Sequence, residues 1–479
     1  MTTDISTPLA HYADRLHAVI GDGHHVASPL GAWLLLALAA PAATGSTRAA
    51  LEEVLGTDVA TAAEAAHALL AEPHPLVRSA TAFWHRPGSG TAGLDGWRAT
   101  LPEPTATGPL PDQDRLDAWA REHTLGLIEE FPLTVTPQVL LVLGSALATR
   151  VSWTDPFEVA PAGALGSHSA WAGGLSRVLR SPKYGHRCWI ADTARAGTVA
   201  VHAAGARTGD GAAGLLVVSV AAAPDVPAGD VLAAAHEMAT AAAGAPEHDL
   251  PAQRRSLFDV PLGEGPLWTL REEQTRTYAP DGREELVTAV LPCWSARSRH
   301  DLTAPGLGFS AVAGVFGELL ESPGLGYEAA QAAMARYGRY GFEAAAITAF
   351  ASSVSLPPEG VARIAELRFG HPYAVVAVAT DSPAGGATGP WHGVPVFLRL
   401  GRRPEGTAGG RRRGPLRRRV TRHGPPGQRV EAAGTRPGRD PDQEVCGSAI
   451  ATAILRGPVN GSRPCAAVML STTSTSSRW

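Results

Sequence analysis

The sequence lacks closely spaced cysteines, and this absence excludes two kinds of structural site. Its four cysteines are Cys188, Cys293, Cys446 and Cys465, and no CxxC motif occurs. Paired cysteines at short spacing are the usual mark of a disulfide framework or a structural zinc site. The sequence therefore predicts neither of these, and we expect no bound metal and no other cofactor.

Long apolar runs and a leader segment are also missing. The first residues, MTTDISTPLAHYADRL, do not form a basic stretch followed by an apolar one, so no secretory signal is visible. The strongest membrane candidate, residues 32–43, contains Pro41 and is shorter than the roughly 20 residues that span a bilayer. We expect this run to be a buried core helix, and we expect no membrane partner.

Catalytic motifs are scarce as well. The sequence HEMAT at His236 lacks the second histidine of a HExxH motif, and GFSAV at 308–312 lacks the last glycine of GxSxG. Glycine-rich phosphate loops do not occur between a predicted strand and a predicted helix. The sequence therefore predicts a protein that is not an enzyme.

Basic residues are concentrated in the last part of the chain. The formal net charge of the 479 residues is −4, yet residues 402–479 contain fifteen arginines and five acidic residues. The residues after 402 are rich in arginine, glycine and proline. They can therefore bury too little apolar surface to offset the conformational entropy that folding costs. We predict one folded domain over 1–402 and a disordered tail over 403–479. A basic tail is attracted to anionic surfaces by charge alone, and we expect no specific nucleic-acid partner.

Helix and strand patterns are unevenly distributed along the folded part. Helices are predicted at 8–20, 28–40 and 47–55, and helical spacing of apolar residues continues at 116–128. Because helices dominate the first third and strands the rest, we expect an α+β fold with a large central mixed sheet. Continuous apolar runs predict its buried strands, at 139–143, 215–220, 374–379 and 394–400.

The stretch GFEAAAITAFASSVSLPPEG, residues 341–360, differs from its surroundings and contains no lysine, arginine or histidine. At period two, one face of its first ten residues is uncharged and fits a sheet, although alanine is a poor strand former. The alternative is a helix over 328–350, which Gly338 and Gly341 would weaken by about 1 kcal/mol each. The prolines at 357 and 358 favour an exposed, extended loop before them.

Several motifs, in order, resemble those of the serpin family, the fold whose reactive loop is bait for a serine protease. The segment that begins SPLGAW, the strand VLLVLGSALATRVSWTDPF and the hinge-like GFEAAAITAF are the most distinctive. Together the motifs extend over about residues 8–402. The similar segments lie at 28–56, 116–128, 139–157, 291–316, 341–350, 368–378 and 394–402.

The resemblance implies a metastable inhibitor of serine proteases that acts as a suicide substrate. In the family, the protease acylates the reactive loop, the loop inserts into the central sheet as an extra strand, and the protease remains covalently trapped. The implied partner is a serine protease, the implied form is a monomer, and the implied location is extracellular, with a cytoplasmic location left open. The implied hinge of the loop comprises Gly341, Phe342, Glu343, Ala344, Ala345 and Ala346.

The resemblance also places the bond that the protease cuts. Counting forward from Gly341 puts the bond between Ser355 and Leu356, whereas counting back from Pro357 puts it between Val354 and Ser355. Either bond offers a small, uncharged side chain to the primary pocket of the protease, which suits elastase- or subtilisin-like enzymes. We favour the Val354–Ser355 bond, because valine fills a shallow apolar pocket better than serine does.

Four positions depart from the family's motifs and leave a second function open. Phe342 replaces a small hinge residue, and overpacking of this kind costs about 1–3 kcal/mol. Where the family's sheet opens, Ser28 is kept, but Gly31, Ser145 and Gln331 replace the usual residues; Ser145 and Gln331 could still bond each other. The alternative function is a non-inhibitory serpin-fold protein, a binding or structural module that is merely cleaved in its loop.

Overall fold

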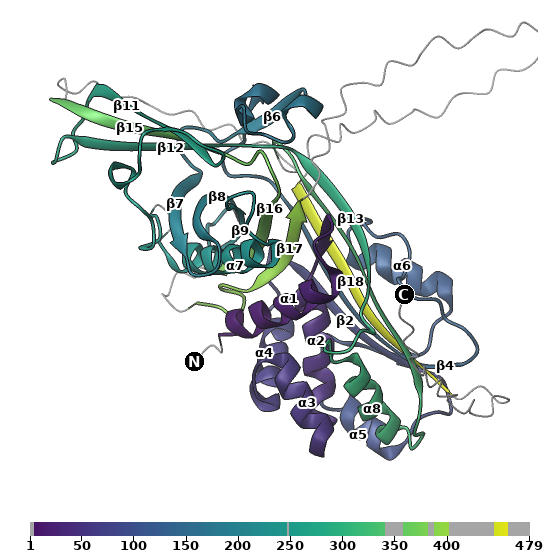
Figure 1. Ribbon diagram of the computed structural model, residues 1–479. Coiled ribbons are helices and arrows are strands. Elements are labelled where there is room, and N and C mark those ends of the chain that lie inside the picture. The colour runs from purple at the N-terminus through teal and green to yellow at the C-terminus, as the bar shows by residue number, and fades with distance from the viewer. Residues whose placement is uncertain (1–3, 247–248, 341–357, 382–387, 402–444, 458–479) are drawn as a thin grey trace, which may run out of the picture.

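Most of the helices gather at one end of the molecule, and the sheets extend beyond them (Figure 1). The computed structural model describes residues 4–246, 249–340, 358–381, 388–401 and 445–457. The α-helices within these ranges are α1 (Ser6–Ile20), α2 (Pro29–Ala39), α3 (Gly45–Leu55), α4 (Val59–Ala71), α5 (Ala92–Arg98), α6 (Gln113–His123), α7 (Ala228–Gly244) and α8 (Phe309–Leu319).

The start and end of the predicted helices follow from local chemistry. The Ser28 side chain caps α2 by accepting a hydrogen bond from the backbone N–H of Gly31, and Pro29 occupies the first helical position. Helix α3 ends at Gly56, which adopts the left-handed conformation with φ +70°. All eleven residues of α2 are buried, so the apolar run of residues 32–43 begins as a core helix, as predicted.

Within the described residues, the strands form three six-stranded sheets. The first, in spatial order, contains β1 (His25–Ala27), β17 (Pro395–Gly401), β16 (Tyr373–Asp381), β9 (Ala213–Ala221), β8 (Gly197–Arg207) and β7 (Arg187–Thr193). The second contains β10 (Gly263–Glu264), β11 (Trp268–Arg276), β15 (Glu359–Arg368), β12 (Arg283–Leu291), β6 (Arg177–Arg180) and β5 (Glu158–Pro161). The third, which we call the central sheet, contains β13 (Trp294–Asp301), β14 (Gly326–Tyr337), β18 (Val445–Arg456), β4 (Val139–Val151), β2 (Arg78–His85) and β3 (Ala106–Pro109).

The two faces of the central sheet pack against different helices. Helix α2 contacts β4 and β18 on one face, and α6 contacts β4 and β2 on the other. The face toward α2 belongs to the main core, whereas the face toward α6 belongs to a smaller cluster that includes Trp84, Trp119 and Ile450. The sheet is therefore buried on both sides along its middle strands, which fits the continuous apolar run at 139–143.

The α+β fold with a large mixed sheet is confirmed, and all four predicted strand runs lie in strands, β4, β9, β16 and β17. The alternative of a helix over 328–350 is wrong for residues 328–337, which belong to β14. Alanine's helix preference is overridden there because both neighbours of β14, β13 and β18, supply hydrogen-bonded ladders. The predicted helix at 116–128 ends at His123, where the Thr124 side chain bonds the carbonyl of Ala120.

One part of the tail prediction is also corrected. Residues 445–456, inside the segment 403–479 that we expected to be disordered, form strand β18 in the central sheet. The Arg-, Gly- and Pro-rich composition holds for the residues before it, whereas VCGSAIATAILR itself is mostly apolar and contains β-branched residues. The boundary at residue 402 and the remainder of the tail lie outside the described residues.

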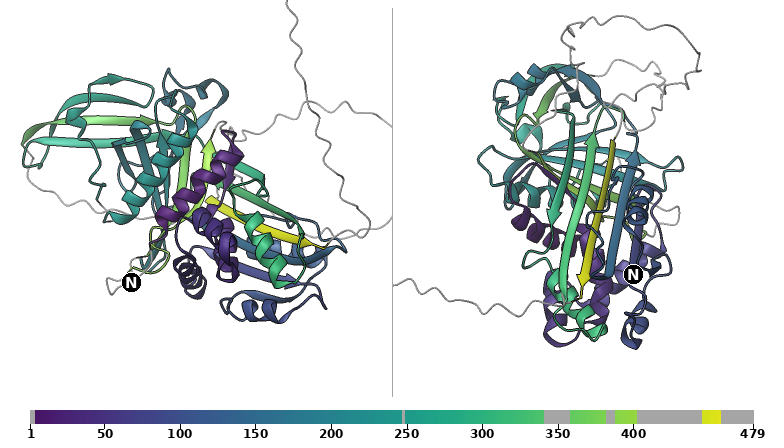
Figure 2. Two further views of the ribbon diagram at one scale, coloured as in Figure 1. Left: turned by 60° about the horizontal axis from the view of Figure 1, so that its bottom comes forward. Right: turned by 90° about the vertical axis from the view of Figure 1, so that its right-hand side faces the viewer.

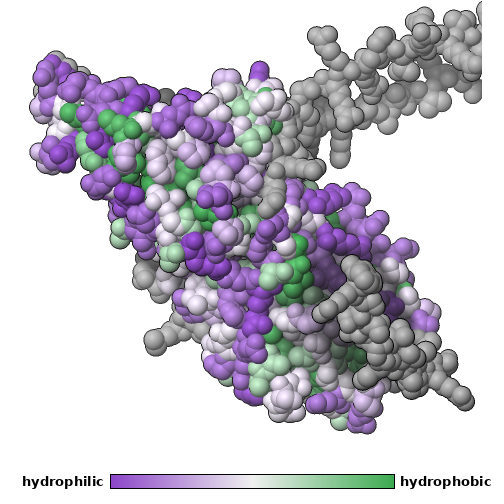
Figure 3. Space-filling model, viewed as in Figure 1, coloured by the Kyte–Doolittle hydropathy of each residue, from purple (hydrophilic) through white to green (hydrophobic). Residues whose placement is uncertain are grey.

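The surface carries mixed polarity, with hydrophilic side chains prominent over the second sheet and smaller apolar areas among them (Figure 3). In the described part of the chain, no helix combines the length and the apolar character that crossing a membrane requires. Over the same residues, no group of three or more His, Cys, Asp or Glu side chains is arranged to hold a metal ion.

Candidate functional site

The position between β14 and β4, which we call the slot, is filled by β18 along its whole length. Strand β18 runs antiparallel to both neighbours, and Figure 2 shows the four strands β13, β14, β18 and β4 side by side. At one end Cys446 is in register with Arg336 and with Arg150. At the other end Arg456 is in register with Gly326 and with Val139. A segment from the end of the chain thus lies in the interior of a sheet.

Ala451 occupies the middle of the slot, at the place where the sequence predicted a sheet-opening cluster. It is in register with Gln331 of β14 on one side and with Ser145 of β4 on the other. Because strands in a sheet lie about 4.8 Å apart, an intervening strand separates the two side chains by roughly 10 Å of backbone. The direct bond that Ser145 and Gln331 could have formed is therefore replaced by another arrangement.

That arrangement joins both side chains to the first turn of α2. The amide of Gln331 donates to the Ser28 carbonyl at 2.8 Å and accepts from the Ser28 N–H at 2.9 Å. The Ser145 hydroxyl donates to the Gly31 carbonyl at 2.6 Å. Ser28, Ser145 and Gln331 are all fully buried, and the Ser28 hydroxyl donates to Val396 of β17 at 2.7 Å. The three predicted cluster residues are thus brought together through backbone groups of α2.

Gly31 contributes to the cluster through its small size. A Cβ atom at this position would lie 3.3 Å from the Ser145 hydroxyl oxygen, closer than most such contacts in proteins. The glycine therefore leaves room for the Ser145 hydroxyl to reach the helix carbonyl. Gly31 and Ser145, which both depart from the family's motifs, thus form one packed unit.

The side chains of β18 differ in size between its two faces. Ala449, Ala451 and Ala453 belong to the main core, on the face toward α2. Ile450 and Ile454 point to the opposite face, where they join the cluster beneath α6. Near one end, a Cβ atom at Gly447 would lie 3.2 Å from the ring of Phe397, so glycine fits the space that this ring leaves. From Gly447 to Ala453 the slot therefore accepts very small residues on this face, and the larger Leu455 follows at the far end.

Polar contacts add to the backbone ladders of β18. The Ser448 hydroxyl donates to the Leu147 carbonyl at 3.1 Å, and the Thr452 hydroxyl donates to the Ala330 carbonyl at 3.3 Å. Both residues are fully buried, so these bonds satisfy groups that have no access to water. Arg456 pairs with Glu328 at 2.9 Å, but both side chains are partly exposed, so this pair contributes little.

The residues that follow β14 cross toward β4 and form what we call the clasp, residues 338–340 with Trp153 and Phe157. The Trp153 indole N–H donates to the Gly338 carbonyl at 3.0 Å, and the Trp153 backbone N–H donates to the Tyr340 carbonyl at 3.2 Å. Phe157 exchanges two bonds with Arg339, one from its own N–H and one to its carbonyl. Since β14 and β4 border the slot, the clasp joins its two walls just beyond their ends.

Two histidines, the half-buried His186 and the buried His202, pack against the clasp. His186 Nε2 donates to the Asp155 carbonyl at 2.7 Å, and His186 Nδ1 therefore accepts from His202 Nε2 at 3.0 Å when both rings are neutral. Burial lowers the pKa of His186 to about 4 and lowers the pKa of His202 further below its usual value. The neutral His186 ring packs edge-on against Phe157 with centroids 4.5 Å apart. The pair thus holds Phe157 in a fixed position.

The remaining predicted site residues cannot be placed. The hinge residues Gly341 to Ala346 and the three residues of the candidate cleavage bonds, Val354, Ser355 and Leu356, lie outside the described residues. The described chain stops at Tyr340 in the clasp and resumes at Pro358, whose carbonyl accepts from the Thr277 N–H at 3.1 Å. Strand β15 begins at the next residue, Glu359.

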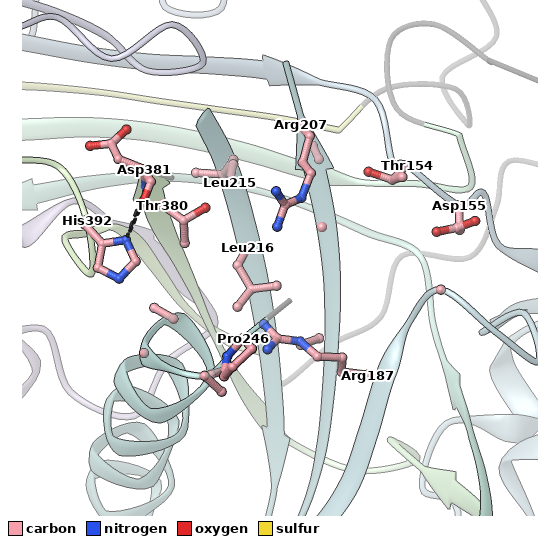
Figure 4. A pocket seen from close by; sticks show the side chains of 18 of the residues that line it. Thr154, Asp155, Arg187, Arg207, Leu215, Leu216, Pro246, Thr380, Asp381 and His392 are labelled. Carbon is pink, nitrogen blue, oxygen red and sulfur yellow. Dashed lines mark hydrogen bonds between the residues drawn. The ribbon is translucent and has the colours of Figure 1, made fainter. Parts of the chain in front are cut away.

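A separate cavity of about 600 Å³ lies beside β8, β9 and the end of α7 (Figure 4). Arg187 and Arg207 project into it from neighbouring strands, and Asp381 and His392 lie at its other side. The carboxylate of Asp381 lies 3.3 Å from His74. The charged groups are spread over the walls and do not converge on one point, so the cavity does not form a second candidate site for chemistry.

Sequence reasoning missed β18 and the clasp. A signal for β18 was present, because small and branched residues alternate through CGSAIATAIL within a tail that is otherwise arginine-rich. The clasp gave no local signal, since it joins Trp153 to residues more than 180 positions later in the chain through backbone carbonyls.

No family model matches the chain, and no curated protein matches it either. Solved structures do match. A cleaved Serpin 42Da structure is 14% identical with a TM-score of 0.50, over 84% of this chain and 97% of that one. The thermophilic serpin tengpin in its latent state is 12% identical with a TM-score of 0.50, over 84% and 98%. Thyroxine-binding globulin in complex with thyroxine is 15% identical with a TM-score of 0.51, over 83% and 99%. At these identities the likeness concerns the fold alone, and the chain has the serpin fold.

Proposed function

We propose that the protein is a serine protease inhibitor that acts as a suicide substrate through a reactive loop, residues 341–357. The observation that carries this proposal is the slot, which holds a twelve-residue strand antiparallel to both β14 and β4, with one register shift against β4 between Leu455 and Arg456. Trapping of a protease requires a sheet that can take up one additional central strand. Tyr340, the last described residue before the candidate loop, lies in the clasp, just beyond the end of the slot.

The proposed targets are elastase- or subtilisin-like proteases, and the proposed bond is Val354–Ser355. Valine before the cleaved bond suits a shallow apolar pocket. A trypsin-like pocket, which contains a buried carboxylate, would be left with an unpaired charge. The proposed complex is covalent, with one protease bound to one inhibitor monomer, and an extracellular setting fits this role.

A non-inhibitory serpin-fold protein is the second candidate, and a specific observation favours it. In the described conformation β18 occupies the slot, so a loop strand cannot enter the same position. Phe342 adds to this obstacle, because β18 presents glycine and three alanines to the main core before Leu455 at its far end, and a large hinge side chain would overpack that space. A protein that stays in this conformation would be cut in its loop without trapping the protease.

The two functions are separated by incubation with an elastase-like protease followed by denaturing gel electrophoresis. The full chain is tested beside the Ala451→Asp variant, which places a carboxylate in the middle of the slot. We expect a band that survives SDS and has the combined mass of the protease and residues 1–354, because cleavage at Val354–Ser355 frees residues 355–479 and SDS removes them. Complete cleavage without this band, in both chains, would establish the non-inhibitory function.

A further inference from the structure

We infer that the slot is a binding site for the chain's own segment 445–456, and that this segment competes with the reactive loop for it. This inference rests on the proposed function as far as the loop is concerned, whereas occupancy by the tail stands on the structure alone. Strand β18 is paired on both edges over its length, from Arg336–Cys446–Arg150 to Gly326–Arg456–Val139. One strand position between two neighbours holds one strand, so the two occupants exclude each other.

The tail segment fits the slot better than the loop segment does. On the face toward α2, β18 places three alanines and, at its far end, Leu455, and a Cβ atom at Gly447 would crowd the Phe397 ring at 3.2 Å. The alternation of the loop sequence GFEAAAITAF would put Phe342 and Phe350 together on one face of a strand. The tail sequence GSAIATAI carries no aromatic residue. Since interiors are close-packed, the smaller occupant requires less adjustment of α2 and of β17.

The connection between β17 and β18 is long enough for the chain to fill its own slot. Residues 402–444 comprise 43 residues between Gly401 and Val445, which reach roughly 140 Å when extended. A folded domain of this size has a radius of gyration of only about 21 Å. A tethered segment has an effective concentration on the order of millimolar. At ordinary protein concentrations the chain's own tail therefore outcompetes the tail of a second copy.

The clasp ties release of β18 to the start of loop insertion. Residues 338–340 bond Trp153 and Phe157 beyond the end of β18, where Cys446 lies between Arg336 and Arg150. A loop strand that enters from β14 must start at this end. It must therefore displace β18 from the Cys446 end first. The tail segment thus slows insertion of the loop in addition to completing the central sheet.

Occupancy can be measured without any reference to inhibition. Trypsin cuts after Arg439 and Arg456 on either side of β18, and residues 341–362 contain no arginine or lysine, so the loop stays intact. We expect peptide 440–456 to remain with the body of the digested full chain in gel filtration and native mass spectrometry. Separation of this peptide from a body that remains folded would overturn the inference. A dimer before digestion, with the peptide exchanged between labelled copies, would overturn the intramolecular assignment.

Variants test the packing that selects the tail. Ala451→Asp should reduce retention of peptide 440–456 at least 10-fold, because it buries a carboxylate between Ser145 and Gln331. Gly447→Val is a milder second variant that crowds the Phe397 ring, and it should reduce retention without introducing charge. Ala432→Asp, the same change outside β18, is the matched control and should retain the peptide as the unaltered chain does.

Competition is measured as the rate of trapping of an elastase-like protease. We expect Ala451→Asp to form the SDS-stable complex at least 10-fold faster than the unaltered chain, and we expect added synthetic peptide 440–456 to reverse this gain. If Ala451→Asp retains less peptide than the unaltered chain but traps the protease at the same rate, the tail segment and the loop do not compete for the slot. Retention of the peptide with no trapping by either chain would refute the proposed inhibitor function and leave tail binding intact.

Discussion

Ser145 and Gln331 are held apart by a single residue of the tail, Ala451, yet both side chains bond the same turn of α2. The Gln331 side chain bonds the N–H and the carbonyl of Ser28, and the Ser145 hydroxyl bonds the Gly31 carbonyl. The first turn of α2 is therefore attached to the sheet on both sides of β18. The attachment does not use any side chain of β18. It can therefore persist whether the slot contains the tail, the loop or neither.

Gln331→Met should destabilise the protein more than Ser145→Ala. Loss of Gln331 leaves both the N–H and the carbonyl of the buried Ser28 without their partners, which costs about 2–3 kcal/mol. Loss of the Ser145 hydroxyl costs about 1 kcal/mol, because Gly31 lies inside α2, where its carbonyl also accepts a helical bond. Urea unfolding midpoints measure both effects. The control is Gln274→Met on the exposed part of β11, and an equal loss there would contradict the assignment.

Cleavage in the loop should change thermal stability only when the slot is free. After an elastase-like protease cuts within 353–356, the melting temperature of the unaltered chain should stay the same, because β18 already completes the sheet. In Ala451→Asp it should rise by more than about 10 °C, the shift expected when several kcal/mol of stability are added. Scanning calorimetry before and after verified cleavage gives both values. A rise of similar size in the unaltered chain would mean that β18 does not complete the sheet in solution.

The free energy of unfolding should fall as the pH falls from 6.5 toward 4. Burial in α7 lowers the pKa of His236 to about 4, against about 6.5 in an unfolded chain. Between these values the unfolded chain binds more protons, so acid favours unfolding, by about 2 kcal/mol at pH 5 for this one histidine. His236→Leu should remove that share of the pH dependence, as measured by urea unfolding at pH 7.5 and 5. His168→Leu, at an exposed position, should leave the slope unchanged.

Trp153→Phe should loosen the clasp locally. The variant keeps most of the ring but removes the indole N–H that bonds the Gly338 carbonyl. Loss of one buried bond, worth about 1 kcal/mol, should speed amide hydrogen exchange of residues 152–158 about 5-fold. Trp33→Phe removes a comparable indole bond, to the Leu55 carbonyl in the helical core, and is the matched control. Unchanged exchange at 152–158 in Trp153→Phe would mean that the clasp does not depend on this bond.

The cleavage position is itself a prediction. Fragments released by an elastase-like protease should end at Val354 and begin at Ser355, because valine fills the shallow primary pocket. Mass spectrometry of the products distinguishes this bond from Ser355–Leu356. A first cut outside 353–356, or faster trapping of a trypsin-like protease, would remove the basis for the proposed specificity.

The sequence predicted what local chemistry determines. Ser28 and Gly56 mark helix boundaries through capping, and the apolar runs at 139–143 and 374–379 lie in buried strands. Strand β18 was missed because composition was averaged over the arginine-rich tail, in which twelve suitable residues are a minority. Its register with Ser145 and Gln331 joins positions more than a hundred residues apart, so no local pattern specifies it. The hinge and the cleaved bond remain predictions.

The place of β18 in the chain has a consequence for biosynthesis. The strand lies in the middle of the central sheet, yet its first residue is made about 100 residues after β14 ends. At roughly 5–20 residues per second, this interval lasts roughly 5–20 seconds. Every newly synthesised molecule therefore passes through a period in which β4 and β14 exist and their common partner does not. The segment that follows β14 is already synthesised in that period. The rate of translation therefore sets how long the proposed loop segment is present without competition from β18.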